Sequence, residues 1–267
     1  MAIELLKKKV ALVFYEVKPY KIAAIIYLIF FQNPIKQNIK TNINILFIYN
    51  IFMELFKHTL YINLEARTDR LAHVQSELAK MNISGERVNA VKMQDGAIGC
   101  SMSHIKCLEL AKARGYPYVF IAEDDITFLD PELLKKNMER FEKELNQHHW
   151  DVLVIGGNNS PPYTQVTDYC MRVFNNQTTT GYIAKAIYYD TLIANFKESV
   201  QKLMREPNQR KSYALDIYWK RLQQTGIWIM IVPPTVIQYA DYSDIEKRVV
   251  DYKPLMLDMK KEWLFRR

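Results

Sequence analysis

From Thr59 onward, short apolar segments of β type alternate with amphipathic helical segments, and this alternation constrains the fold more than any other feature of the chain. The first unit is a β-type run over residues 59–64, followed by apolar residues at helical spacing between Leu71 and Met81. Strands that alternate with helices of about 10–15 residues indicate a mostly parallel sheet with helices on both faces. We therefore predict an α/β fold, in which ligands bind at the carboxyl ends of the strands.

The rest of the chain continues this pattern. The elements expected next, in chain order, are a helix at 103–113, a strand at 118–122, a helix opened by Asp130-Pro131, a strand at 151–155, an apolar segment at 181–186, a helix that carries Leu192, Phe196, Val200 and Leu203, a helix near 216–222 and a strand at 227–232. Asp130 is expected to cap its helix, with Pro131 at the first helical position. After Gly156, a polar stretch of about 25 residues with little periodicity predicts a functional loop.

Residues 1–52 differ in composition from the rest of the chain, because they contain no Gly, Arg or Asp and are rich in Ile, Lys, Asn and Phe. We predict a domain of residues 53–267 preceded by a segment, 1–52, of uncertain status. Three interpretations of that segment stay open. It is an extension that packs on or beside the domain, a tract translated from upstream of a true start at Met53, or a membrane-surface helix, which Pro19 and Pro34 disfavour.

The composition excludes several classes of protein. Hydrophobic residues are 49% and charged residues 24% of the 267, so a disordered or fibrous chain is not expected. The net charge of +7 is concentrated at the N-terminus, where residues 1–57 hold eight Lys against three Glu, which leaves +2 for the rest. A domain-wide basic surface for nucleic acid is therefore not predicted.

Neither a membrane span nor a disulfide framework is predicted. The most apolar run covers residues 22–31, and a spanning helix needs about 20 residues. The three cysteines, Cys100, Cys107 and Cys170, are odd in number and lack C-x-x-C spacing, which fits a reducing compartment. We expect a cytoplasmic protein, and we leave open a peripheral membrane contact and the oligomeric state.

The strongest local signal is the acid triplet, Glu123-Asp124-Asp125, which follows the apolar strand at 118–122. Three adjacent acids repel one another unless a cation or hydrogen bonds neutralise them. Their hard oxygen ligands favour Mg²⁺ or Mn²⁺, and such an ion keeps coordination sites for a diphosphate. The alternative is a solvated acidic turn in which one acid caps the next helix.

A second candidate is the Ser103-His104 pair at the start of the helix expected at 103–113. A helix N-terminus presents free N–H groups and partial positive charge, which suit an anion such as phosphate. The alternative is that Ser103 is a helix cap and His104 a half-buried histidine whose hydrogen bonds are satisfied. Adjacent side chains diverge on a helix, so a Ser–His nucleophile pair is excluded.

Further candidates each carry two interpretations. Gly156 and Gly157 permit close backbone approach to a ligand, but the chain has no G-x-G-x-x-G and no Walker loop, which excludes a classical dinucleotide enzyme or P-loop NTPase. Asp216 is either a helix N-cap or a general base. Arg67 and Arg70 either face a phosphate or are solvated.

Taken in order, these segments resemble glycosyltransferase family 25, which includes lipopolysaccharide β-galactosyltransferases and procollagen galactosyltransferases. The matching segments are YINLEARTDR at 61–70, GCSMSH at 99–104, VFIAEDD at 119–125, TGY at 180–182, Asp216, PPTVIQ at 233–238 and YSDI at 242–245. The resemblance spans about residues 58–246. Residues 91–99 are short compared with many relatives, which bears on contacts to the acceptor.

The resemblance implies a GT-A type nucleotide-sugar fold and an inverting transfer of a hexose, usually galactose, from a UDP-sugar. The acceptor would be a hydroxyl of a glycan, a lipid-linked glycan or a protein. The acid triplet would replace the family's Asp-x-Asp motif, with Asp125 as the principal ligand of Mn²⁺ or Mg²⁺ and Glu123 as its partner. Asp216 matches an acidic position that suits the base.

The donor-binding residues predicted from the motifs and the resemblance together are Asn63, Leu64, Arg67, Arg70, Ser103, His104, Glu123, Asp124, Gly156, Gly157 and Tyr182. Two other classes of function remain as alternatives. A non-catalytic sugar-nucleotide-binding protein would keep the same fold without turnover. A phosphohydrolase is suggested by Glu123-x-Asp125-x-Thr127, which is similar to the D-x-D-x-T loop of aspartate-nucleophile phosphatases, but Glu at the nucleophile position argues against it.

Overall fold

The computed structural model describes residues 54–243 and 245–264. The segment 1–52 and the predicted boundary at Met53 lie outside the described residues, so both stay predictions. Leu55 and Phe56, two of the first described residues, are fully buried, and the Phe56 ring packs edge-on against Phe120 with 4.9 Å between centroids. The hydrophobic core therefore includes the first residues of the described chain.

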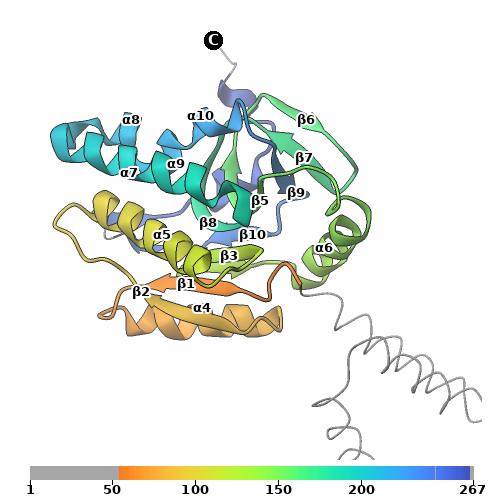
Figure 1. Cartoon of the computed structure of the whole chain (residues 1–267), viewed down its shortest axis with the longest axis horizontal. Helices are drawn as coiled ribbons and strands as arrows, with labels where there is room; N and C mark the ends of the chain where they lie inside the picture. Colours follow the sequence, from red (N-terminus) through yellow and green to blue (C-terminus); the bar gives the residue numbers. More distant parts are fainter. Residues whose placement is uncertain (1–53, 244, 265–267) are drawn as a thin grey trace, which may run out of the picture. The chain divides into compact units, whose positions relative to one another are not determined.

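The centre of the fold is an eight-stranded mixed sheet (Figure 1). In spatial order it consists of β2 (Gly85–Asn89), β1 (Thr59–Asn63), β3 (Tyr118–Glu123), β8 (Asn176–Lys185), β5 (Val152–Asn159), β9 (Trp228–Ile231), β7 (Cys170–Val173) and β6 (Tyr163–Gln165). The pairing directions make β8 and β7 antiparallel to the other strands. The predicted α/β fold with a mostly parallel sheet is confirmed, and the antiparallel β8 between β3 and β5 is an addition.

Helices cover both faces of the sheet, as predicted (Figure 1). The four long ones are α4 (Thr68–Lys80), α5 (Gly96–Ala113), α6 (Pro131–Glu144) and α7 (Tyr189–Arg205). Strand β3 shows how the faces divide, because successive side chains of a strand point to opposite sides. Val119 and Ile121 pack in the cluster that holds α5 and α7, whereas Phe120 and Ala122 pack in the cluster that holds α4 and α6.

Short elements complete the described chain. They are β4 (Ile126–Phe128) paired with β10 (Val236–Gln238), the hairpin of β11 (Asp241–Ser243) and β12 (Arg248–Val250), the helices α8 (Arg210–Tyr213), α9 (Leu215–Tyr218), α10 (Lys220–Gln223) and α11 (Lys253–Leu257), and the 3₁₀ turns at Ala186–Tyr188, Pro207–Gln209 and Glu262–Leu264.

Helix α5 begins earlier than predicted. Its N-cap is Asp95, whose carboxylate accepts a hydrogen bond of 2.9 Å from the Ala97 N–H. Ser103 and His104 therefore lie inside the helix, and the predictions that they present a helix N-terminus to an anion, or that Ser103 is a cap, are both wrong. The Ser103 hydroxyl instead donates to the Gly99 carbonyl and accepts from the Val91 N–H, at 2.7 and 2.8 Å. The predicted cap at Asp130 is confirmed by its 3.0 Å bond from the Leu133 N–H.

The polar stretch after Gly156 is not a loop. Strand β5 continues to Asn159, and the residues that follow form β6, β7 and most of β8. Gly156 and Gly157 lie within β5, where a Cβ on Gly156 would meet Val236 Cγ1 at 2.8 Å and one on Gly157 would clash with the Asn176 side chain. Side chains pack directly on the backbone here, so these positions require glycine.

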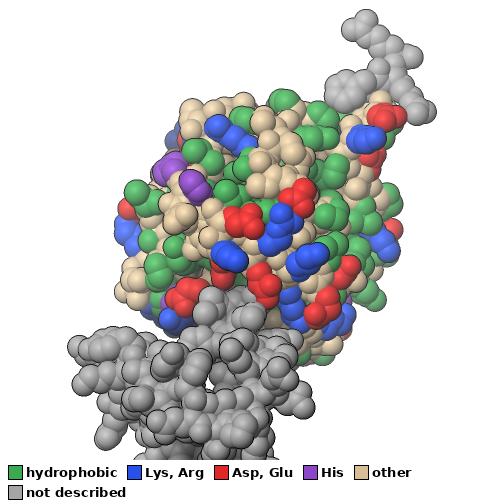
Figure 2. Space-filling model, turned by 90° about the vertical axis from the view of Figure 1, so that its right-hand side faces the viewer, with side chains coloured by type: hydrophobic (Ala, Val, Ile, Leu, Met, Phe, Trp, Pro, Cys, Tyr) green, Lys and Arg blue, Asp and Glu red, His purple; other side chains and the backbone are tan. Residues whose placement is uncertain are grey.

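The described residues include no helix that could span a bilayer, and charges of both signs are mixed on the face shown in Figure 2. No helix within residues 54–243 and 245–264 has the length and apolar character needed to cross a membrane. On the face in Figure 2, Lys and Arg side chains lie intermixed with Asp and Glu side chains. That face has no basic patch of the kind that binds nucleic acid.

The packing on Gly157 gives a test of its role. We expect Gly157→Ala to lower the free energy of unfolding by about 1–3 kcal/mol, because a methyl group there overpacks the buried Asn176 side chain. Thermal or urea unfolding measures the change. Adding Asn176→Ala should recover part of the loss that Gly157→Ala causes, and a double variant showing purely additive losses would contradict the packing explanation.

Candidate functional site

One cavity of about 220 Å³ lies at the carboxyl ends of β1 and β3. Asn63 ends β1 and Glu123 ends β3, with the rest of the acid triplet directly after it, so the edge predicted from sequence is the edge where the cavity lies. Of the predicted donor-binding and metal residues, the cavity lining includes Asn63, Leu64, Arg67, Arg70, Ser103, His104, Glu123, Asp124 and Asp125. It does not include Gly156, Gly157, Tyr182 or Asp216.

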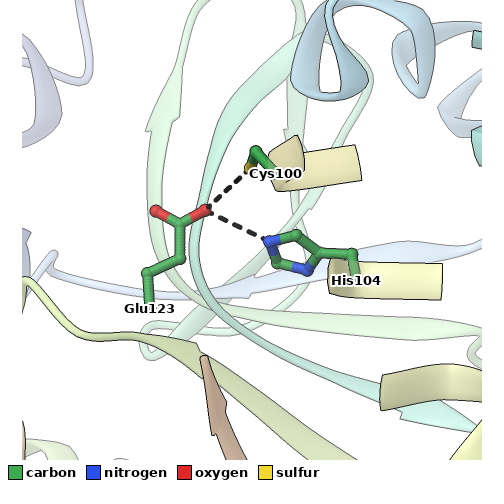
Figure 3. A group of neighbouring side chains, drawn as sticks. All are labelled: Cys100, His104 and Glu123. Carbon is green, nitrogen blue, oxygen red and sulfur yellow. Dashed lines mark hydrogen bonds and ion pairs between the residues drawn. The ribbon is translucent and has the colours of Figure 1, made fainter. Parts of the chain in front are cut away.

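Glu123 is held by hydrogen bonds from two other elements. Its Oε1 accepts from His104 Nε2 of α5 at 3.2 Å and from Thr179 Oγ1 of β8 at 2.6 Å, and Cys100 Sγ lies 3.9 Å away (Figure 3). Burial acts to raise the pKa of Glu123, but the bonds from His104 and Thr179 hold it below its ordinary value. Glu123 is therefore the acid of the triplet whose pKa lies below its ordinary value, whereas the other two are raised.

Asp124 is bound by the first strand and the first helix. Its carboxylate accepts from Asn63 Nδ2 at 2.7 Å and from the Arg70 guanidinium at 3.2 Å. Burial nevertheless raises its pKa. The Asn63 amide also accepts from Arg87 Nε at 3.0 Å through Oδ1, which fixes the orientation of its N–H group toward Asp124.

Asp125 is the least compensated acid. Its Oδ2 accepts from Gln238 Nε2 at 2.9 Å and from Arg70 at 3.1 Å, whereas its buried Oδ1 has no hydrogen-bond partner among the described residues. Burial, followed by repulsion from Glu123, raises the pKa of Asp125 to about 7. A buried carboxylate oxygen without a partner is the kind of group that a hard divalent cation would satisfy.

Arg70 supplies a positive charge that partly neutralises the acid triplet. Its guanidinium makes ion pairs with Asp124, Asp125 and Asp241, at 3.1–3.2 Å. Arg67 pairs with Asp69 and Asp241. Neither arginine is simply solvated, so that alternative is wrong, and a single guanidinium bridges two acids of the triplet and the β11 residue Asp241.

Asp216 is half-buried beside β8 and does not cap its helix. Its Oδ2 accepts from the Thr178 N–H at 3.0 Å, and α9, which begins at Leu215, has no side-chain cap. The N-cap interpretation of Asp216 is therefore wrong. Burial raises its pKa, and the charge of Glu123 raises it further, so the two carboxylates lie close enough to interact.

His104 and Tyr182 connect the cavity to the core. Both are fully buried, and His104 Nδ1 lies 3.1 Å from the Tyr182 hydroxyl. This matches the alternative in which His104 is a satisfied histidine, although it is fully rather than half buried. Gln238 and Cys100 join the site without having been singled out, and the available signal was that both lie in segments of the family resemblance.

The site offers ligand atoms for a metal ion at two places. The unpartnered Asp125 oxygen suits Mn²⁺ or Mg²⁺, because these ions prefer oxygen ligands. Among the described residues, Cys100, His104 and Glu123 also bring a sulfur, a nitrogen and an oxygen atom within 4.8 Å of one another. The donor sets differ in softness, so the two groups suit different metals.

Comparison with known proteins gives a family match for part of the chain. Residues 92–216, which include α5, the acid triplet and Asp216, match the model of glycosyltransferase family 25 (LPS biosynthesis protein). The match covers slightly less than half of the chain. The resemblance noted from the sequence motifs is thereby confirmed.

Two curated relatives are distant and longer than the match. The chain is 26% identical over 141 residues to "Inactive glycosyltransferase 25 family member 3" of Mus musculus, covering 42% of this chain and 24% of that protein. It is 30% identical over 92 residues to a Haemophilus influenzae protein named as a glycosyltransferase without donor or acceptor, covering 26% of this chain and 33% of that protein. The matches span only about a quarter to a third of these relatives.

Solved structures show a weak likeness. A glycosyltransferase involved in glycosylation of the major capsid of PBCV-1 aligns with a TM-score of 0.42 at 9% identity, over 68% of this chain and 92% of that one. A Drosophila galactosyltransferase solved with manganese, UDP-Gal and xylobiose aligns with a TM-score of 0.31 at 13% identity, over 51% of each chain. At these scores the likeness decides neither donor nor metal.

The raised pKa of Asp125 predicts a pH dependence of stability. Its ordinary value is 3.8 and its folded value about 7, so the folded state binds this proton more tightly and loses stability as pH rises through that window. Asn cannot ionise. In metal-free buffer, the melting temperature of Asp125→Asn minus that of the unmodified protein should therefore increase from about pH 4 to about pH 8.

The control for this experiment is Asp168→Asn. Asp168 is exposed, and its hydrogen bond from Arg140 lowers its pKa, so the folded state favours rather than disfavours its charge. This variant should show no such increase. A flat or shrinking difference for Asp125→Asn would mean that the folded protein does not disfavour the Asp125 charge.

Proposed function

We propose that this domain is an inverting, metal-dependent glycosyltransferase of GT-A type that moves a hexose from a UDP-sugar to a hydroxyl of a glycan, a lipid-linked glycan or a protein. The observation that carries the proposal is the unpartnered Asp125 oxygen in a cavity at the carboxyl ends of β1 and β3, within the family 25 match. Galactose is the donor sugar that the family resemblance implies.

On the donor side, Asp125 would hold Mn²⁺ or Mg²⁺, and Glu123 would assist toward the metal or the ribose. When bound, such an ion stabilises the negative charge that builds on the leaving diphosphate. Asn63 and Leu64 line the same cavity at the end of β1, where the nucleotide would lie. Arg67 and Arg70 have side chains mostly shielded from solvent at 18% and 14% exposure, so their charges would act strongly on a diphosphate.

On the acceptor side, Asp216 would take the proton of the attacking hydroxyl. A general base works best when its pKa approaches the operating pH, and burial shifts the pKa of Asp216 upward. The Thr178 N–H would hold the carboxylate in place through Oδ2, leaving Oδ1 for the acceptor. The acid that binds the metal and the acid that accepts the proton would then belong to separate elements.

A non-catalytic UDP-sugar-binding protein is the second candidate. One observation favours it, namely that the mouse relative is named as inactive. Such a protein would keep metal-linked UDP binding and release no UDP from any UDP-sugar, with or without an acceptor. A panel of UDP-sugars with Mn²⁺, scored both for binding and for released UDP, separates the two candidates.

We expect Asp125→Ala to abolish the Mn²⁺-dependent part of UDP binding while the protein stays folded and keeps a cooperative thermal transition. The carboxylate provides charge at a strand end and no apolar packing, so its loss removes a ligand rather than core contacts. Calorimetric titration of UDP with and without Mn²⁺ measures the effect. Asp168→Ala, at an exposed acid on another surface, is the control, and unchanged Mn²⁺-linked affinity in Asp125→Ala would exclude Asp125 as the ligand.

We expect Asp216→Asn to lose transfer by about 10²–10⁴-fold while it keeps its melting temperature and its UDP affinity with Mn²⁺. Asn can still accept the Thr178 N–H but cannot take a proton from the acceptor. Asp190→Asn, at an exposed acid in the first turn of α7, serves as the control. Transfer at the level of the unmodified protein would move the base elsewhere, with Asp241 next, and with Asp244, which lies outside the described residues.

A further inference from the structure

Cys100 and His104 lie four residues apart on α5, so their side chains lie one turn apart on the same face of the helix. Both point toward Glu123 at the end of β3 (Figure 3). All three residues line the 220 Å³ cavity, so an ion can reach them. We propose that Cys100, His104 and Glu123 form a binding site for Zn²⁺, separate in its chemistry from the oxygen-ligand metal site at Asp125.

The spacing of the three ligand atoms is close to that of a tetrahedral zinc site. With Zn–S near 2.3 Å and Zn–N and Zn–O near 2.0–2.2 Å, the S···O edge is about 3.6 Å and the N···O edge about 3.4 Å. The observed separations from Glu123 Oε1 are 3.9 Å to Cys100 Sγ and 3.2 Å to His104 Nε2. Shifts of a few tenths of an ångström along these edges, with closure of the S···N edge, would bring the ligands into place.

The donor set selects zinc over the ions expected at Asp125. Thiolate and imidazole ligands favour Zn²⁺, whereas Mg²⁺ and Mn²⁺ prefer carboxylate, carbonyl and water oxygens. Three protein ligands leave the fourth tetrahedral position for water or another ligand from the cavity. Within the described residues, no other group of three or more His, Cys, Asp or Glu side chains has this arrangement.

The residues behind the ligands are suited to hold them. A zinc-binding imidazole usually donates its other ring N–H to a fixed partner. His104 Nδ1 lies 3.1 Å from the fully buried Tyr182 hydroxyl, which can accept when Nδ1 is protonated and donate when Nε2 is protonated. The hydroxyl therefore supports the present bond from Nε2 to Glu123 and also the tautomer that zinc needs. The Thr179 hydroxyl donates a hydrogen bond to Glu123 Oε1 and so orients this carboxylate.

Zinc binding at this site releases a proton. Burial, with the neighbouring carboxylates Glu123, Asp216 and Asp125, raises the pKa of the Cys100 thiol, so the Zn–S bond forms as the S–H bond breaks and one proton leaves to solvent. Affinity should rise with pH. Zinc would also engage Glu123, so bound zinc should weaken Mn²⁺-linked UDP binding. That consequence rests on the proposed function, whereas zinc binding itself does not.

The test uses the full chain without donor or acceptor. Zn²⁺ titration should show one site, and Co²⁺ in its place should show thiolate-to-cobalt charge-transfer absorption. Cys100→Ala should abolish this absorption. It should also weaken zinc binding more than the loss of a residue that only hydrogen-bonds a ligand, which costs about 10–100-fold. Cys107→Ala, on the same helix but in the core, is the matched control and should bind as the unmodified protein does. Cys100→Ser replaces Cys100→Ala if the alanine variant unfolds.

A further variant tests the outer partner. Tyr182→Phe should lower zinc affinity by about 10–100-fold and keep the charge-transfer absorption, because the three ligands remain. Full zinc affinity in both Cys100 variants, or the absence of the charge-transfer absorption in the unmodified chain, would overturn the proposal. Because no UDP-sugar is present, these outcomes are independent of whether the transferase proposal holds.

Discussion

The burial of three adjacent carboxylates at the end of β3 is the constraint on which the rest of the site depends. Each acid needs donors, and the donors come from different parts of the chain. They are Asn63 of β1, Arg70 of α4, His104 of α5, Thr179 of β8 and Gln238 of β10. Because an unpaired buried charge is costly, the acid triplet draws these five elements together at one edge of the sheet.

The three acids are chemically unequal although they are neighbours in sequence. Hydrogen bonds keep the pKa of Glu123 low, whereas burial raises the pKa of Asp124 and raises that of Asp125 to about 7. Burial acts to raise all three values, and the acids differ in what opposes or adds to it. His104 and Thr179 lower the pKa of Glu123, whereas repulsion from Glu123 adds to the effect of burial on Asp125, one oxygen of which meets no donor among the described residues. The protein therefore keeps one carboxylate incompletely neutralised beside an open cavity at some cost in stability, as the proposed cation site requires.

Strand β8 connects the two acidic positions. It lies antiparallel between β3 and β5, and consecutive residues in it serve different acids, because the Thr178 N–H binds Asp216 and the Thr179 hydroxyl binds Glu123. Tyr182, further along the same strand, contacts His104. One strand thus sets the positions of a carboxylate far away in sequence, of the triplet's first acid and of the histidine in the proposed zinc site.

The sequence by itself determined the α/β class, the alternation that places helices on both faces, and the strand end where the acid triplet lies, because periodicity and strand ends are local properties. It did not determine where α5 starts, since Asp95 acts as a cap only through the geometry of its side chain. It also did not determine the strands after Gly156, because their polar residues show no hydrophobic periodicity. Tertiary structure alone decided that Arg70 neutralises the acids and that Asp216 binds Thr178, because partners so far apart in the chain meet only when the sheet assembles.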